Sequence, residues 1–437
     1  MIDDRTLVRR TDPAVAGTRY PWAVVLGCFA AVAAALTVVV AVNDRYRPGG
    51  DPDVLQGPAW LDGWFQYDAG WYFHIATQGY SYAPGQQSSI AFFPVYPTGV
   101  RGLGALLGDY QVAGSLLAVL AGALSVVLFG RWVWQRLPRP AAVTAVAVLL
   151  LYPYAFFLYG AMYADSLFLL CAVGAFLALE RRWFWAAGLI GALATAGRPV
   201  GVAVAVGLVV RTLEIVAADR RRARTQEPAA RGDDQAEPVA SDAPDDAPDD
   251  APGGAGRVPW RELVTAVVGI RPRHLGVLLS GAGLAAWCAF LWTEFGNPLA
   301  FVEVESAPGW NQGVGPHTWF KITFFGTLVR GPYDVAALLA LQAVMCVCGV
   351  LLLRRVQRLF GWGYAAYTFV VLLIPIVGTK DFMGTGRYVL VAFPALAAAG
   401  DLLARSPHRW LRPVVLGACA VLLALLTSLY GRSVAVS

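Results

Sequence analysis

The sequence predicts an all-α protein that crosses a membrane many times. Apolar residues make up 57% of the 437 residues, charged residues only 14%, and the mean hydropathy is +0.55. These values lie far outside the range of soluble globular domains. A membrane-spanning helix needs about 20 mostly apolar residues, and eleven continuous apolar runs approach that length. This number of runs excludes a soluble enzyme with a single membrane anchor.

Eleven spans are predicted along the chain, because the apolar residues run on without the alternation typical of strands. The first run is long enough to cross and lacks a clear small-residue cleavage site, so we expect a retained span rather than a signal peptide. The fifth and sixth runs are short and share Arg198 and Pro199 at their junction, which is typical of a broken or re-entrant pair. The predicted spans lie at residues 22–42, 111–130, 141–159, 162–179, 184–197, 199–216, 275–292, 334–353, 362–378, 388–404 and 412–430.

Arginine side chains orient these spans. With the N-terminus in the cytoplasm, every short loop on that side carries arginine, as the positive-inside rule requires. Arg131, Arg136 and Arg139 after the second span are an example. The loops at 43–110 and 293–333 then lie on the outer face. High Ala, Arg and Gly content with only two lysines indicates a GC-rich genome, so we expect a multi-pass protein of a bacterial plasma membrane.

Two loops stand out within what we expect to be a single transmembrane domain, residues 1–437. Residues 219–256 repeat Asp-Ala-Pro and hold almost no large apolar side chain, so they predict a disordered cytoplasmic linker. The loop at 43–110 is rich in Trp, Tyr, Phe, Gly and Pro. Aromatic residues at this density are typical of a membrane interface or a ligand site, and we expect short helices lying on the outer leaflet.

The distribution of polar residues favours a site at the outer membrane face. A transporter is expected to place paired charges or broken helices near the middle of the membrane, whereas here the polar residues of interest lie at outer span ends and in outer loops. The sequence offers no metal-ligand cluster, no Ser-His-Asp arrangement and no glycine-rich nucleotide loop. Carboxylates and arginines remain, which suit a reaction that needs one base and a stabilised phosphate leaving group.

A series of short motifs resembles the PIG-V-type mannosyltransferases, the family of GPI mannosyltransferase II. Each motif alone is weak, but their ordered combination over residues 60 to 400 is fairly specific. Tyr67 stands where Trp is common, Asp165 replaces a usual Glu, and the linker at 219–256 has no counterpart. The motifs are Tyr67-Asp68-Ala69-Gly70-Trp71-Tyr72 with Ile75-Ala76 and Gly79-Tyr80, residues 91–97, residues 152–157, Tyr163-Ala164-Asp165-Ser166, Arg181-Arg182-Trp183, Arg198-Pro199, residues 296–301, and Gly386-Arg387-Tyr388 with Phe393-Pro394.

The resemblance implies a GT-C glycosyltransferase fold, a lipid-phosphate sugar donor, and a catalytic acidic residue in the first outer loop. Carried over to this sequence, that residue is Asp68. A carboxylate within hydrogen-bond reach can take the proton of an acceptor hydroxyl as it attacks the sugar, and the phosphate leaving group needs no general acid. The competing interpretation is that Asp68 only caps a helix that starts at Ala69.

Two further carboxylates are candidates. Asp165 lies at the outer end of the fourth span, where an ionisable residue indicates function, and we expect it to hold acceptor or donor sugar unless it is a helix cap. Asp62 is a weaker candidate, for which a solvated loop position is the favoured interpretation.

Arg198, Arg387 and Lys380 are the candidates for binding the donor phosphate. Guanidinium groups bind phosphate in a bidentate manner and stay charged in apolar surroundings. The alternative for Arg198 is an arginine that extends to the membrane interface. Lys380 and Asp381 share the short loop before Arg387, where they could pair with each other.

Trp71, Tyr72, His74 and Tyr163 complete the expected substrate-binding set. Trp71 and Tyr72 could stack on a sugar ring, although an aromatic belt is the more common explanation. A lone interfacial His74 is more often a hydrogen-bonding surface residue than a base. The outer acidic residues are not spaced as ligands on one helical turn, so we expect neither a metal nor a cofactor.

The sequence thus predicts an inverting transferase that moves mannose from polyprenyl-phosphate-mannose to a lipid-linked or cell-envelope acceptor, with membrane lipids around it and no nucleic-acid partner. Mannose and inversion come from the resemblance. The alternatives are another sugar on the same polyprenyl phosphate, a lipid or glycolipid flippase, and a non-catalytic scaffold.

Overall fold

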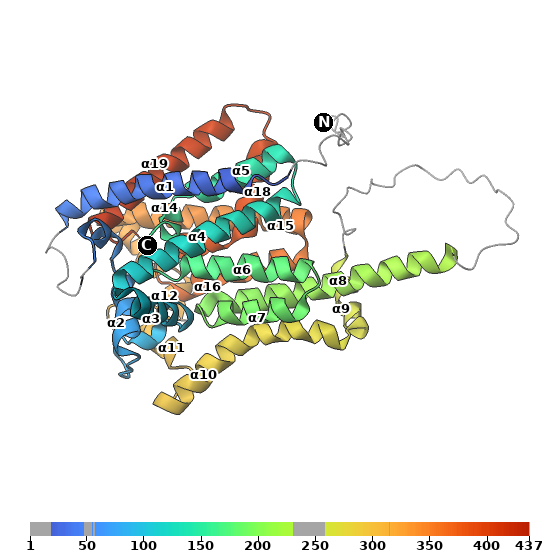
Figure 1. Cartoon of the computed structure of the whole chain (residues 1–437), viewed down its shortest axis with the longest axis horizontal. Coiled ribbons are helices and arrows are strands. Elements are labelled where there is room, and N and C mark those ends of the chain that lie inside the picture. The colour runs from blue at the N-terminus through green and yellow to red at the C-terminus, as the bar shows by residue number, and fades with distance from the viewer. Residues whose placement is uncertain (1–18, 48–54, 56, 230–257, 314, 437) are drawn as a thin grey trace, which may run out of the picture.

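The structure, a computed structural model, describes residues 19–47, 55, 57–229, 258–313 and 315–436. Within these residues every regular element is a helix, which confirms the predicted all-α class. The long helices run side by side, and the short helices α2, α3 and α11 gather at one end, here called the α2–α3 end (Figure 1). The helices are α1 (Trp22–Asn43), α2 (Asp68–Gln78), α3 (Val95–Leu107), α4 (Tyr110–Trp134), α5 (Arg139–Leu151), α6 (Asp165–Glu180), α7 (Phe184–Thr195), α8 (Val202–Ala229), α9 (Trp260–Ala266), α10 (Ala282–Phe295), α11 (Ala300–Glu303), α12 (Pro316–Trp319), α13 (Ile322–Arg330), α14 (Tyr333–Leu351), α15 (Leu353–Phe360), α16 (Trp362–Gly378), α17 (Thr385–Val391), α18 (Phe393–Ala404) and α19 (Leu411–Gly431).

Six of the described helical segments are long and apolar enough to cross a membrane, and the bent pair α17 and α18 makes a seventh. Helices α5, α7 and α16 are apolar but shorter. The chain is therefore a multi-pass membrane protein, although the predicted count of eleven spans is not confirmed. The six segments are Trp22–Tyr46, Tyr110–Trp134, Pro199–Arg224, Pro272–Phe295, Tyr333–Leu351 and Leu411–Gly431.

Proline interrupts two of the predicted spans. The run at 141–159 stops being an α-helix at Leu151, because Tyr152 precedes Pro153 and takes an extended conformation with ψ 135°, as residues before proline prefer. The run at 388–404 bends by 76° between α17 and α18. Pro394 lies in the first turn of α18, where its missing N–H group costs nothing. Both predictions of a continuous span were wrong at these residues.

The Arg198-Pro199 junction separates two unequal helices. Helix α7 has only 12 residues, whereas α8 has 28 and belongs to a segment long enough to cross. Between them Arg198 is extended and Pro199 begins a short 3-10 turn. The structure therefore places a chain break at the α2–α3 end, next to α6 and α17, which fits the predicted break but leaves α8 as a full-length helix.

The predicted linker at 219–256 is partly helical. Helix α8 continues to Ala229, and the Asp219 carboxylate accepts two hydrogen bonds from Arg182, at 2.5 and 2.7 Å. The prediction of disorder was therefore wrong for residues 219–229, where α8 extends beyond the bundle (Figure 1). The rest of the predicted linker lies outside the described residues.

Short helices do form in the loop at 43–110, as predicted. Helices α2 and α3 lie at the α2–α3 end, and the opposite end holds the first residues of α1 and the last turns of α8 (Figure 1). The short helices of the loop at 43–110 and the start of the first predicted span thus lie at opposite ends of the bundle. The last described residues also reach the α2–α3 end, because the Arg47 Nε donates to Ser433 at 3.2 Å.

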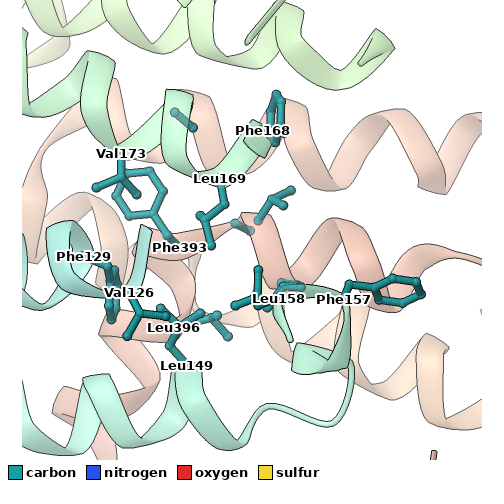
Figure 2. Close-up of a cluster of buried hydrophobic side chains, with 14 of the residues drawn as sticks. Val126, Phe129, Leu149, Phe157, Leu158, Phe168, Leu169, Val173, Phe393 and Leu396 are labelled. Carbon is teal, nitrogen blue, oxygen red and sulfur yellow. The ribbon is translucent and has the colours of Figure 1, made fainter. Parts of the chain in front are cut away.

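The core continues from the middle of the bundle to this end. Leu149 of α5, Val126 of α4 and Leu396 of α18 lie together, and the same cluster includes Phe157 and Phe168, the latter in the first turn of α6 (Figure 2). All are nearly inaccessible to solvent. This packing fixes the helix ends that carry the charged residues described below.

The N-terminus of α16 is capped by a side chain from another helix. Oxygens of Glu214 in α8 accept hydrogen bonds from the backbone N–H groups of Trp362 and Gly363, and Glu214 also pairs with Arg211 at 3.1 Å. These N–H groups have no partner within α16.

We expect Glu214→Ala to lower the free energy of unfolding by about 1 to 2 kcal/mol, because the capping acceptor is lost. The measurement is thermal unfolding in detergent. Glu214→Gln, which keeps an acceptor, should lose less, and an alanine variant as stable as wild type would contradict the capping role.

Candidate active site

A strained backbone turn at Tyr67 positions Asp68. Tyr67 has φ 51° and ψ −114°, a conformation that costs a non-glycine residue about 1 to 3 kcal/mol. The Tyr163 hydroxyl holds both sides of this turn, accepting from the Asp68 N–H and donating to the Gln66 carbonyl, each at 3.1 Å. Tyr163 is nearly fully buried, so the start of α2 is fixed from the core.

Arg387 meets Asp68 at this turn. Its Nη1 lies 3.0 Å from Asp68 Oδ2, although the two residues are 319 positions apart in the chain. Arg387 is in the first turn of α17, after Gly384, whose φ of 80° suits glycine. A Cβ on Gly386 would overlap the ring of Tyr154, so α17 can approach this end of the bundle only with glycine there.

Asp165 and Arg198 extend the pair to a line of four alternating charges. The Arg198 Nη1 donates to Asp165 Oδ1, and Asp165 Oδ2 lies 4.0 Å from Arg387 Nη1. The order is therefore Arg198, Asp165, Arg387, Asp68. The side chain of Asp165 is 1% exposed and that of Arg198 is 9% exposed, whereas that of Asp68 is 30% exposed. A ligand can therefore reach the Asp68 end of the line.

Aromatic rings surround both guanidinium groups. Arg387 lies over Phe157 and Tyr163, with 5.3 and 5.1 Å to the ring centroids. Arg198 lies 5.2 Å from the ring centroid of Tyr388. Cation–π contacts of this kind are strongest where water is excluded. The Nε of Arg387 is buried and has no hydrogen-bond partner among the described residues, so one donor of this side chain is unused.

These contacts decide between the interpretations left open by the sequence. The carboxylates of Asp68 and Asp165 bind arginine instead of capping their helices. Arg198 is buried and paired, so the alternative of an arginine extending to the membrane interface was wrong. Asp62 is 7% exposed and accepts a hydrogen bond from Gln111 at 2.8 Å, so the expected solvated position was also wrong.

The predicted aromatic residues pack around α2. The Trp71 ring stacks on Phe92 with centroids 5.8 Å apart and 18° between the ring planes, while Tyr72 is buried edge-on against Phe92 and Tyr163. His74 is half-buried, and its imidazole makes no hydrogen bond or ion pair within the described residues. Contact of Trp71, Tyr72, His74, Asp165 or Tyr163 with a substrate stays a prediction, and for the buried members it would require side chains to move.

Lys380 is bonded to the loop before α12 rather than to the charged line. Its Nζ donates to the Trp310 carbonyl at 2.8 Å, and its backbone N–H donates to Gln312 Oε1 at 2.8 Å. Asp381 instead accepts from the Met383 N–H at 3.1 Å. In place of the expected pairing with Asp381, Lys380 connects the loop before α17 to the loop that contains Trp310 and Gln312.

Glu305 is the site residue that the sequence analysis missed. It is half-buried in the turn after α11, and the charges of both Asp68 and Arg387 act on it. Burial, reinforced by the negative charge of Asp68, raises the pKa of Glu305 to about 7, although Arg387 opposes the shift. The only signal in the sequence was its place in the loop at 293–333, four residues beyond the Gly296 to Phe301 motif.

No group of three or more His, Cys, Asp or Glu side chains in the described part of the chain is arranged to hold a metal ion. The acidic residues of the line are instead engaged by arginine. The expectation of a reaction without metal or cofactor stays a prediction.

Fold and site together define a multi-pass helical membrane protein with a charged site at one end of its bundle. No protein-family model and no curated protein matches the chain. The structure is similar to the Archaeoglobus fulgidus oligosaccharyltransferase in its apo form, at 12% identity and a TM-score of 0.40, covering 92% of this chain and 56% of that one. It is also similar to the archaeal oligosaccharyltransferase AglB from Archaeoglobus fulgidus in complex with an inhibitory peptide and a dolichol-phosphate, at 11% identity and a TM-score of 0.38, covering 92% and 56%. This chain spans just over half the length of each.

Proposed function

We propose that this protein is a GT-C type, inverting glycosyltransferase that moves mannose from polyprenyl-phosphate-mannose to a lipid-linked or cell-envelope acceptor. The site would lie on the extracytoplasmic face of the plasma membrane, with the N-terminus in the cytoplasm. The choice of mannose and of inversion rests on the resemblance of the motifs to PIG-V-type enzymes.

The observation that carries the proposal is the contact between Asp68 and Arg387 at 3.0 Å. It joins a reachable carboxylate to a guanidinium group with unused donor capacity. Transfer from a phosphate-linked sugar needs a proton acceptor next to an anion-binding group. The contact brings these two groups together at the end of the bundle where α2 and α3 lie.

Each group then has a step in the reaction. Asp68 takes the proton of the acceptor hydroxyl while that oxygen forms a bond to the anomeric carbon of mannose. The bond from that carbon to the phosphate oxygen breaks, and polyprenyl phosphate leaves with one more negative charge. Arg387 stabilises this charge, because bidentate guanidinium contacts to phosphate are among the strongest hydrogen bonds in proteins. Arg198 contributes indirectly, through its ion pair with Asp165, which lies 4.0 Å from Arg387.

The test is transfer of labelled sugar in membranes that contain the protein. We expect labelled mannose to move from polyprenyl-phosphate-mannose into a lipid or polymer fraction, with opposite anomeric configuration in donor and product. Donors carrying glucose or arabinose on the same polyprenyl phosphate serve as matched controls. Preference for one of these donors would correct the sugar, and label that crosses the bilayer without transfer would support a flippase and contradict the enzyme.

A further inference from the structure

A short segment lies beside α2, the helix that begins at Asp68. Residues 304–313, here called the 304–313 segment, follow α11 and lie against the aromatic side chains of the first outer loop. The ring centroid of Trp310 is 5.9 Å from that of Trp71 and 6.1 Å from that of Phe92. Gln87 Nε2 donates to the Pro308 carbonyl at 3.2 Å. The segment therefore has a fixed position relative to α2.

The same segment is also tied to the chain just before α17. Lys380 donates to Trp310 and Gln312 as described, and the Gly313 N–H donates to the Gly378 carbonyl at 3.2 Å. Within the segment the Gln312 N–H donates to the Glu305 carbonyl at 2.8 Å. The backbone of Glu305 thus belongs to a segment held between α2, which begins at Asp68, and the chain just before α17, which carries Arg387.

The carboxyl group of Glu305 has no hydrogen bond or ion pair within the described residues. The titratable groups that act on it or on which it acts are Asp68 from α2 and Arg387 and Tyr388 from α17. With Asp68, Asp165, Arg198 and Arg387 ionised, the line of charges has no net charge. An ionised Glu305 would make the site negative and repel a phosphate, whereas a neutral carboxyl group offers an O–H donor.

We propose that Glu305 is a ligand-binding residue of this site and, as a neutral carboxyl group, donates a hydrogen bond to a phosphate oxygen of the anionic lipid donor. The inference rests on the proposed function, since it takes the donor to be a phosphodiester. Arg387 holds the same phosphate by charge, so the two residues contact it from the 304–313 segment and from α17.

Proton binding and donor binding are linked in this arrangement. The pKa of Glu305, raised to about 7 in the free protein, rises further when an anion binds beside it, because the negative charge favours the neutral form. Above pH 7 the free protein has lost this proton and must regain it to bind the donor. Affinity for a phosphodiester therefore falls as the pH rises through 7.

The test is the pH dependence of binding of a short-chain prenyl methyl phosphodiester to the full chain in detergent, followed by calorimetry. A diester is required because the second ionisation of a monoester, with a pKa of about 6, would itself change over this range. For wild type we expect binding to be about tenfold weaker at pH 8 than at pH 6, the result for one linked proton.

Two variants separate Glu305 from other groups. Glu305→Gln keeps an N–H donor and cannot ionise, so its affinity should be the same at both pH values and near that of wild type at pH 6. Glu303→Gln is the matched control, because Glu303 is exposed and bonded to Tyr82 and Asn297, and it should keep the wild-type pH dependence. A wild-type affinity that does not change with pH, or a pH dependence that persists in Glu305→Gln, would overturn the proposal.

The remaining outcomes are also decisive. If Glu305→Gln does not fold, calorimetric titrations of wild type in two buffers of different ionisation enthalpy still measure the number of protons taken up when the phosphodiester binds. Absence of proton uptake near pH 7.5 would rule the proposal out. If wild type binds no phosphodiester even at pH 6, the donor site itself is wrong, and the proposed function fails with it. Binding that is independent of pH would remove only the role of Glu305.

Discussion

Replacement of Asp68 by asparagine is expected to lower the rate of sugar transfer by about 10² to 10⁴, the range that general-base catalysis contributes. The amide has nearly the same shape but cannot take the acceptor proton. Donor binding should not weaken, because Arg387, 3.0 Å from Asp68 in the structure, would lose a competing anion. The measurement is transfer from labelled polyprenyl-phosphate-mannose, with donor affinity determined separately.

Asp109→Asn is the matched control for this variant. Asp109 belongs to the same loop, residues 43–110, and caps α4 by accepting from the Val112 N–H at 2.9 Å. Asparagine caps helices as well as aspartate does. Its transfer rate should match wild type. If Asp68→Asn retained transfer within a few-fold of this control, Asp68 would not be the base, and Glu305 would be the next carboxyl group to test.

The second large effect is expected on stability when Asp165 is replaced by alanine. Its carboxylate is 1% exposed and contacts Arg198, which is 9% exposed. Removal of one partner leaves a buried guanidinium group without its counter-charge, which costs about 3 to 5 kcal/mol. The free energy of unfolding in detergent should fall accordingly, and thermal unfolding should occur at a lower temperature.

A double variant shows whether the loss comes from the unpaired charge. Asp165→Ala combined with Arg198→Met removes both charges in surroundings that include the rings of Phe168 and Tyr388, so we expect most of the stability to return while transfer remains low. Asp219→Ala, which breaks an exposed pair with Arg182, should cost less than about 1 kcal/mol. An Asp165→Ala protein as stable as this control would contradict the buried pair.

Composition and hydropathy were sufficient to predict the helical class and most helix positions. The run at 22–42 coincides with α1, and the run at 412–430 coincides with α19. In lipid each backbone group must bond within its own helix, so a long apolar run is expected to be helical. The length of the apolar runs was therefore enough to predict where these helices lie. The breaks after Leu151 and at Ala392 were missed although Pro153 and Pro394 stood in the sequence, because a proline can kink, end or begin a helix.

The linker prediction failed for a different reason. Residues 219–229 contain few apolar side chains, but they continue the helix that begins at Val202. Ion pairs from Arg182 to Asp219 and from Arg221 to Glu262 stabilise this extension. Low hydrophobicity predicts that a segment has no core of its own, and it does not predict whether a preceding helix will extend through it.

What the sequence determined by itself was the kind of protein and the kinds of group available for its chemistry. Apolar runs and arginine placement identified a multi-pass membrane protein, and the motifs singled out Asp68, Asp165, Arg198 and Arg387. Only the tertiary structure decided that these four side chains form one alternating line, that Asp165 is buried within it, and that the charges of Asp68 and Arg387 act on Glu305. Asp68 and Arg387 are 319 residues apart. Sequence periodicity describes only which way a side chain faces on its own helix, so it does not predict that these two residues meet. Which distant helix ends meet is set by the packing of the whole bundle.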